Sequence, residues 1–398
     1  MLYLVKSNYW LNLNFISTSI LSFTLSVFFA NYLSKETFGL YQFVLSSFSI
    51  IATFTLTGMN TVITKHTALG LEGTMQKSIR SQFLYGLIPS LISFFVSAWY
   101  FMNNNIELSV SFLLMSISIP IITTFNSFNS FLIGKKMFKK HFTYNFIFNI
   151  TYYGLMIFIV YKNPNLVWLV FGNYLVTSIL NYIFYKKTKK HVENDNFSKD
   201  FNNSAIHQSI SNILPSILTT IDYILIYKIL GPSTLAIYSI ISAIPTRLFG
   251  FIRNITASAT PKISTQSEEN VRNNISQKVL KFILLGTIVG TFYLIVAEPI
   301  FNVFFPTYKE YIKLSYLYII PAILSVTSSF TSTYFILTQS KKNIYVYNTI
   351  YPILSISSVV VGGLYMGIIG VIIGRSIGYL FTIIISLILI KNISIKNQ

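Results

Sequence analysis

The sequence predicts an all-α membrane protein of about twelve transmembrane helices, arranged in two six-helix lobes. Three observations indicate this: long apolar segments recur along the chain, basic residues gather in alternate loops, and the two halves resemble each other. Apolar residues make up 53% of the 398 residues and charged residues only 10%, against roughly 25% charged in an ordinary soluble domain. A helix needs about 20 mainly apolar residues to cross a hydrocarbon core of about 30 Å. A chain that repeats such segments along its whole length belongs in a bilayer.

The apolar segments place the individual helices. In the first half we expect them at 8–32, 38–62, 83–102, 108–133, 142–160 and 166–184. In the second half we expect them at 206–230, 234–257, 279–297, 314–337, 344–364 and 368–390. Cysteine is absent, which leaves out disulfides, thiol nucleophiles and thiolate metal sites.

The distribution of basic residues predicts the orientation, because cytoplasmic loops are enriched in lysine and arginine. With the N-terminus inside, 22 of the 29 basic residues fall on the cytoplasmic side, 5 fall outside, and Arg247 and Arg375 fall within spans. Both termini are therefore expected in the cytoplasm. The formal charge of +18 is spread over short loops rather than one continuous face. We therefore expect anionic membrane lipids, and no nucleic acid, as the partner of these charges.

An internal repeat predicts the domain organisation. The longest polar interruption lies near the middle of the chain, so we expect an N-terminal lobe at 1–188, a cytoplasmic linker at 189–204 and a C-terminal lobe at 205–398. A shift of 197 positions places Leu33, Thr37 and Tyr41 on Leu230, Thr234 and Tyr238. Both copies join a first helix to a second. Halves that start in the same orientation indicate parallel repeats, and such transporters bind substrate between them.

Polar side chains recur at helical spacing in four predicted helices. Because polar groups are costly against lipid, these stripes indicate which faces meet protein or water. The candidates for lining a substrate cavity are Asn14, Gln42, Ser49, Asn60, Gln208, Ser211 and Thr246. The repeat places Asn14 on Ser211 and Ser49 on Thr246, so spacing and repeat select the same surface. The alternative is that the hydroxyl groups hold helices together at close contacts.

Ionisable residues within the predicted spans are further candidates, because charges at that depth are rare and usually functional. At about 1.5 Å per residue, Asp222 lies roughly 13 Å below the outer surface and Arg247 about 20 Å, near the midplane. We assign Arg253, with Arg247 in support, to an anionic substrate group, and Asp222 to binding of a coupling ion. In the alternative, Arg253 reaches the inner headgroups and Arg247 forms a permanent ion pair with Asp222. Arg375 is expected to have a structural role.

The sequence contains no motif for nucleotide binding or metal-dependent catalysis. It contains neither a phosphate-binding loop nor a metal-ligand pair such as His-Glu-x-x-His, and its loops are too short to hold a nucleotide-binding domain. We therefore expect a transporter without catalytic residues, metal or ATPase rather than an enzyme.

Two short motifs follow the first and second predicted helices. They are Leu33-Ser34-Lys35-Glu36-Thr37-Phe38-Gly39-Leu40-Tyr41 and Gly58-Met59-Asn60-Thr61, the latter leading to Lys65. Together with twelve helices in two parallel halves, they resemble the O-antigen and capsular repeat-unit flippases of the Wzx type. These flippases are the polysaccharide-transporter branch of a superfamily that also holds multidrug and toxin extruders. The resemblance spans the whole chain.

The resemblance implies a MATE-like fold, with two lobes related by a pseudo-two-fold axis along the membrane normal. It implies a substrate, an oligosaccharide on undecaprenyl pyrophosphate, moved from the cytoplasmic to the periplasmic leaflet of a bacterial inner membrane. Polysaccharide polymerase and chain-length proteins are the implied partners, and H⁺ or Na⁺ is the implied coupling ion. The alternatives are a cation-coupled exporter of drugs or small solutes with the same fold, and a membrane-embedded polymerase or ligase.

Overall fold

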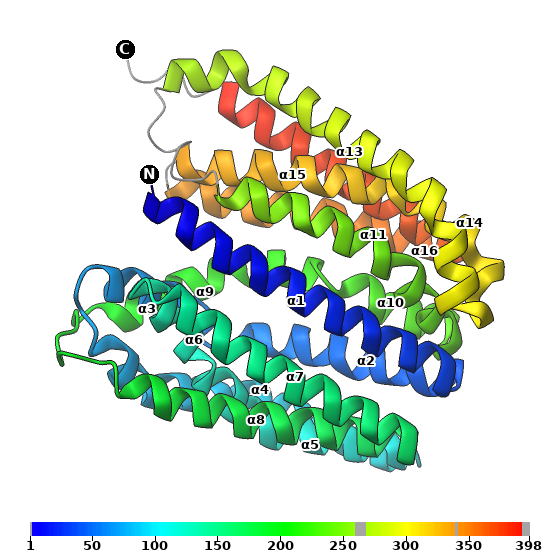
Figure 1. The fold of residues 1–398 in the computed structure, drawn as a ribbon, viewed down its shortest axis with the longest axis horizontal. Helices are drawn as coiled ribbons and strands as arrows, with labels where there is room; N and C mark the ends of the chain where they lie inside the picture. The colour runs from blue at the N-terminus through cyan, green and yellow to red at the C-terminus, as the bar shows by residue number, and fades with distance from the viewer. Residues whose placement is uncertain (1, 259–267, 339–340, 392–398) are drawn as a thin grey trace. The chain divides into compact units, whose positions relative to one another are not determined.

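A computed structural model describes residues 2–258, 268–338 and 341–391, and these residues form helices and connections without a β-strand (Figure 1). Contacts divide the chain into two compact units, Met1–Thr220 and Ile221–Gln398. Each unit has its own buried core. That of the first contains Met59, Phe131 and Phe184, and that of the second contains Ile275, Phe335 and Tyr347.

The first unit is built from ten helical elements. They are α1 (Leu2–Tyr32), α2 (Lys35–Ile51), the 3-10 turn η1 (Ala52–Phe54), α3 (Gly58–Ala68), α4 (Thr74–Met102), α5 (Ile106–Phe125), α6 (Ser127–Gly134), α7 (Phe138–Lys162), α8 (Leu166–Lys189) and α9 (Phe201–Leu218). Helix α5 packs against both α4 and α8, α1 packs against α7, and α3 packs against α6 and α9.

The second unit contains α10 (Ile221–Leu230), α11 (Pro232–Ser258), α13 (Glu268–Phe304), η2 (Pro306–Tyr311), α14 (Ile312–Leu317), α15 (Ile319–Thr338) and α16 (Lys341–Lys391). Helix α15 packs against α11, α13 and α16, and α10 packs against α11 and α16. Helix α16 is two helices in sequence, because Gly367 between them has φ 58° and ψ −136°. Glycine adopts this left-handed conformation without the steric cost of a Cβ atom.

The described helices accommodate the predicted spans. Nine are long and apolar enough to cross a membrane, or eleven if each of two bent pairs counts as one span. The division of α16 at Gly367 brings the described part of the chain to the twelve predicted. Large apolar side chains such as Phe95 and Ile295 are 67% and 72% exposed. In a bilayer these side chains face hydrocarbon rather than water, which removes the cost of exposing them.

Four spans that we expected to be continuous are interrupted. The second, at 38–62, breaks between η1 and α3, and the fourth, at 108–133, breaks at Asn126. The seventh, at 206–230, breaks after Leu218, and the tenth, at 314–337, breaks at Tyr318. At two of these breaks a side-chain hydroxyl binds a backbone carbonyl. Thr55 Oγ1 donates to Ala52 O at 2.8 Å, and Thr219 Oγ1 donates to Ser216 O at 2.7 Å. Such bonds offer the backbone an alternative to the regular helix ladder.

The break in the seventh span coincides with the boundary between the units. The expected linker at 189–204 contains the nonhelical stretch 190–200 between α8 and α9, while α9 belongs to the first unit and α10 to the second. Helix α9 lies in direct backbone contact with α3. The Gly58 amide donates to Ser209 Oγ at 2.8 Å, and a Cβ atom on Gly58 would lie 2.5 Å from Ala205 O.

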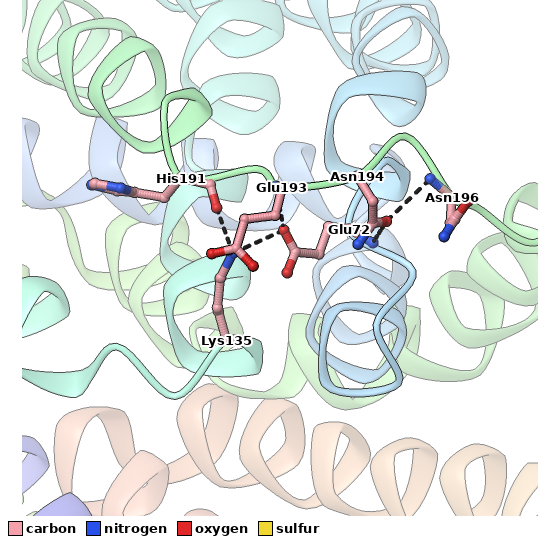
Figure 2. Close-up of polar contacts among 6 residues, drawn as sticks. All are labelled: Glu72, Lys135, His191, Glu193, Asn194 and Asn196. Atoms are coloured by element: carbon pink, nitrogen blue, oxygen red, sulfur yellow. Dashed lines mark hydrogen bonds and ion pairs between the residues drawn. The ribbon is translucent and has the colours of Figure 1, made fainter.

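The linker is held on the first unit by a cluster around Lys135 (Figure 2). Its ammonium group lies 2.9 Å from Glu72 Oε2 and 3.0 Å from Glu193 Oε1, and donates to His191 O at 2.6 Å. The Glu193 amide donates to Glu72 Oε2 at 2.7 Å, and the Glu72 amide donates to Asn194 Oδ1 at 3.3 Å. The linker is therefore docked through both its backbone and its side chains.

Charge complementarity stabilises this cluster. Burial lowers the pKa of the Lys135 ammonium, but the hydrogen bonds and charges of Glu72 and Glu193 outweigh burial and raise that pKa above its ordinary value. The Glu72 side chain is only 8% exposed. A carboxylate so little hydrated depends on its cation, because a buried charge is costly unless it is paired.

We predict that Lys135→Met releases the linker. Loss of the cation leaves Glu72 without its ion pair, at a cost on the order of 1–3 kcal/mol. Because 1.4 kcal/mol corresponds to about tenfold in an equilibrium constant, the released form of the linker should become roughly ten times more populated. Limited proteolysis should therefore cut the linker of the variant roughly ten times faster than that of the wild type. Lys139→Met, at an exposed position on α7, should not change the rate. Equal cleavage of all three proteins would contradict the docking role.

Candidate functional site

The second unit contains a buried ion pair between its first and last helices. Asp222 lies in the first turn of α10, where the helix dipole favours a negative charge, and it is fully buried. Its Oδ1 lies 3.0 Å from Arg375 Nη1, and its Oδ2 accepts a hydrogen bond of 2.5 Å from the Tyr238 hydroxyl. The three residues come from α10, α11 and α16, so the network ties three neighbouring helices together.

The partner of Asp222 differs from the one we expected. We considered Arg247, because it is close in sequence, whereas the ion pair in the structure is with Arg375, 153 positions further along. The physical reason is helix packing: α10 lies against the second part of α16, which carries Arg375. Arg247 is half-buried on α11, in the same helix as Tyr238.

Two arginines line a small cavity within this unit. Its volume is about 50 Å³, and it is lined by Thr246, Arg253, Tyr318, Pro321, Ala322, Ser325, Arg375 and Tyr379. Thr246 and Arg253 are seven residues apart on α11, close to two full turns, so their side chains share a face. The Arg375 guanidinium also lies 5.7 Å from the centroid of the Tyr379 ring, a cation–π contact that fixes its orientation.

This cavity can bind a small anion. A guanidinium group carries five N–H donors, so the contact of Arg375 with Asp222 does not exhaust its capacity. Thr246 and Ser325 add hydroxyl groups that can donate to oxygen. One water molecule needs at least about 10–15 Å³ of cavity volume. The volume of this cavity is therefore enough for a few water molecules or one phosphate group. We call it the arginine cavity.

A second cavity lies within the first unit, and its lining is neutral. It measures about 170 Å³ and is lined by Phe48, Ala52, Thr55, Leu56, Thr57, Asn60, Gln82, Ile122, Thr123 and Asn126. Three of these are carboxamides and three are hydroxyls, and none is charged. We call it the amide cavity. Of the candidates from the sequence, it contains Asn60.

The structure brings the remaining candidates together only in part. Thr246 and Arg253 share the arginine cavity, while Asp222 lies behind it through its contact with Arg375. The candidates outside the lining of both cavities are Asn14, Gln42, Ser49, Gln208, Ser211 and Arg247. All six are at least partly accessible, and Gln208 donates to Asn212 Oδ1 along α9 at 3.5 Å.

Sequence reasoning missed several residues of the arginine cavity. Arg375 was expected to be structural, and Tyr318 and Tyr379 were not singled out. One signal was available: Arg375 lies seven residues inside the last predicted span, far from either loop, and a buried charge needs a partner. The tyrosines gave no such signal, because the chain contains 27 of them.

Solved structures of known transporters share this fold. An outward-facing multidrug resistance MATE family transporter of the MOP superfamily superposes with a TM-score of 0.65 at 14% identity, over 97% of this chain and 94% of that one. The inward-facing conformation of such a transporter gives 0.68 at 12% identity, over 95% and 96%. A MATE protein in complex with MaD5 gives 0.67 at 13% identity, over 98% and 95%. The expected MATE-like, all-α membrane fold is thereby confirmed.

The sequence defines the family. Residues 4–266 match the polysaccharide biosynthesis protein family, so the chain belongs to that family. No curated protein matches it. Family membership and fold together describe a multi-pass membrane protein of the polysaccharide biosynthesis family, with the fold that MATE transporters have.

We predict that Arg375→Met destabilises the protein and that adding Asp222→Asn restores it. The single change leaves a fully buried carboxylate without its cation, which costs about 3–5 kcal/mol, whereas removal of both charges is close to neutral. Melting of the detergent-purified proteins, followed by the loss of monodisperse protein on size exclusion, measures this. A single variant as stable as the wild type, or a double variant no better than the single, would show that the pair does not support the fold.

Proposed function

We propose that the protein is a flippase that moves an undecaprenyl-pyrophosphate-linked oligosaccharide from the cytoplasmic to the periplasmic leaflet. The observation that supports this most directly is the arginine cavity, with Arg253 and Arg375 in a transporter of polysaccharide biosynthesis. A lipid carrier of this kind presents two linked phosphates at the membrane. Guanidinium groups suit them because their planar forks form paired hydrogen bonds and keep their charge.

The geometry of the cavity gives its arginines different roles. Arg375 is held from behind by Asp222 and faced by Tyr379, so its position is fixed before a substrate arrives. Arg253 comes from another helix, α11, and adds a second guanidinium group to the lining. Preorganised donors lose little conformational entropy on binding, which favours affinity for one phosphate group.

The charge distribution of the sequence supports the proposed setting. With 22 of 29 basic residues on one side, the chain would sit in a bacterial inner membrane with both termini in the cytoplasm. Substrate would then arrive from cytoplasmic glycosyl transfer and leave to a periplasmic polymerase and chain-length proteins. A cation-coupled drug exporter is less well supported, because the one acidic group at the arginine cavity is already paired with Arg375.

Asp222 is the proposed site of ion coupling. It alone among the described residues combines a carboxylate with full burial inside a predicted span. Binding of H⁺ or Na⁺ to this carboxylate would weaken its contact with Arg375 and thereby change how firmly Arg375 is held in the cavity. Ion binding and substrate binding would thus act on one side chain, which is what coupling between two sites requires.

We predict that Arg253→Ala reduces polysaccharide export at least tenfold at normal protein levels. Charge-assisted hydrogen bonds contribute about 1.5–3 kcal/mol each, and the variant loses all those of Arg253. Arg253→Lys should recover part of the export, since lysine keeps the charge but lacks the fork. Surface polysaccharide in a deletion strain that expresses each variant gives the readout, with the exposed Arg80→Ala as the matched control. Normal export by the Arg253→Ala variant would show that Arg253 does not bind the phosphates of the lipid carrier.

A second prediction concerns Asp222→Asn, which preserves the shape of the side chain and its ability to accept from Tyr238. We expect a protein that is less stable than the wild type, because Arg375 loses its carboxylate, but that still binds the lipid and whose transport no longer depends on an ion gradient. Transport into proteoliposomes, measured with and without imposed H⁺ and Na⁺ gradients, tests this. Gradient-dependent transport at the wild-type rate would eliminate Asp222 as the coupling group.

A further inference from the structure

The amide cavity lies where two helices of the first unit are interrupted. Thr55, Leu56 and Thr57 separate η1 from α3, and Asn126 separates α5 from α6; all four residues line the cavity. Irregular backbone at membrane depth is tolerated only where it is buried in protein or lines a polar space. Two interruptions at one cavity therefore mark a place built for polar contacts.

The side chains of the cavity also indicate a polar occupant. Gln82 is only 4% exposed and uses its amide nitrogen on Ser78 Oγ at 3.0 Å. Asn60 Oδ1 is buried, and it has no hydrogen-bond partner among the described residues. A buried acceptor left without a donor costs about 1–3 kcal/mol. A ligand that donates to Asn60 would remove this cost.

We propose that the amide cavity binds one neutral sugar residue of the transported oligosaccharide; this inference rests on the function proposed above. An engineered cavity of about 150 Å³ holds benzene, so the 170 Å³ available here is enough for a single six-membered ring. Carboxamides both donate and accept, as the vicinal hydroxyls of a sugar do. Phe48, Leu56 and Ile122 supply apolar surface for the C–H faces of the ring.

The lining argues against an ion as occupant. An anion would require the cationic donors that the arginine cavity has and the amide cavity lacks. Hard cations are held by carboxylates together with carbonyl oxygens, and no carboxylate lines this space. A neutral group with several hydroxyls matches the donors and acceptors without leaving a charge uncompensated.

The position of the cavity fits the proposed direction of transport. Asn60 precedes Lys65 by five residues and Asn126 precedes Lys135 by nine, or about 7 and 13 Å along a helix at 1.5 Å per residue. Both lysines fall on the predicted cytoplasmic side. The cavity therefore belongs to the cytoplasmic half of the first unit, on the side where a newly made lipid-linked sugar enters.

Three substitutions test the assignment. Asn60→Leu and Thr123→Val remove polar groups from the lining at nearly constant volume. Thr124→Val is the matched control, because Thr124 is the next residue on α5, fully buried and outside the cavity. The full-length proteins in nanodiscs would be titrated with two probes, bare undecaprenyl pyrophosphate and the lipid-linked repeat unit extracted from cells that lack the transporter.

The expected result is a loss of sugar preference alone. The wild type and Thr124→Val should bind the glycosylated lipid more tightly than the bare lipid. In Asn60→Leu and in Thr123→Val that preference should fall roughly 2- to 10-fold, the range for one neutral hydrogen bond of about 0.5–1.5 kcal/mol. Affinity for bare lipid should stay unchanged in all three variants, which also shows that they are folded.

Other outcomes separate the two proposals. Equal wild-type affinity for both lipids, or a preference unchanged in both Asn60→Leu and Thr123→Val, would overturn the sugar site while leaving the flippase intact. If Asn60→Leu lost ²²Na⁺ binding but kept the preference for the glycosylated lipid, the amide cavity would be a cation site and the sugar site would be overturned. Failure of the wild type to bind either lipid would overturn the flippase proposal itself, and the sugar site with it.

Discussion

The buried ion pair between Asp222 and Arg375 is the interaction on which the second unit depends. It joins the first turn of α10 to the second part of α16, and Tyr238 of α11 closes the network. In a bilayer, such charges are tolerated only when paired, because lipid offers no water to solvate them. The same contact fixes the guanidinium that lines the arginine cavity. Stability and the candidate site therefore rely on one side chain.

The two repeats each bury a tyrosine at the same position but hydrogen-bond it to different groups. Tyr41 and Tyr238 correspond in the repeat, and both are buried. Tyr238 donates to a carboxylate, whereas the Tyr41 hydroxyl accepts from Asn173 Nδ2 at 2.9 Å and lies 3.4 Å from the Tyr152 hydroxyl. One unit thus holds its central tyrosine in a charged network and the other in a neutral one. The cavities follow the same division, with arginines in the second unit and carboxamides in the first.

The sequence predicted the apolar spans and the membrane class, because hydropathy is a property of single segments. It also identified Asn60, Thr246 and Arg253, since helical spacing alone marks their polar faces. It could not predict the contact of Asp222 with Arg375, which depends on how α10 packs against a helix about 150 positions away. Nor could it predict the interrupted spans. At these breaks apolar composition continues, so the hydropathy pattern does not distinguish a break from a continuous helix.

The division of the seventh span has a consequence for how the chain could be cut. Because α9 packs on α3 through Gly58 and Ser209, the helix that follows the linker belongs structurally to the part that precedes it. A chain severed within the linker would leave two fragments, and the later fragment would still insert α9 into the core of the earlier one. The packing of α9 against the earlier fragment would keep the two fragments associated. The linker is thus a natural position for making this protein from two separately synthesised polypeptides.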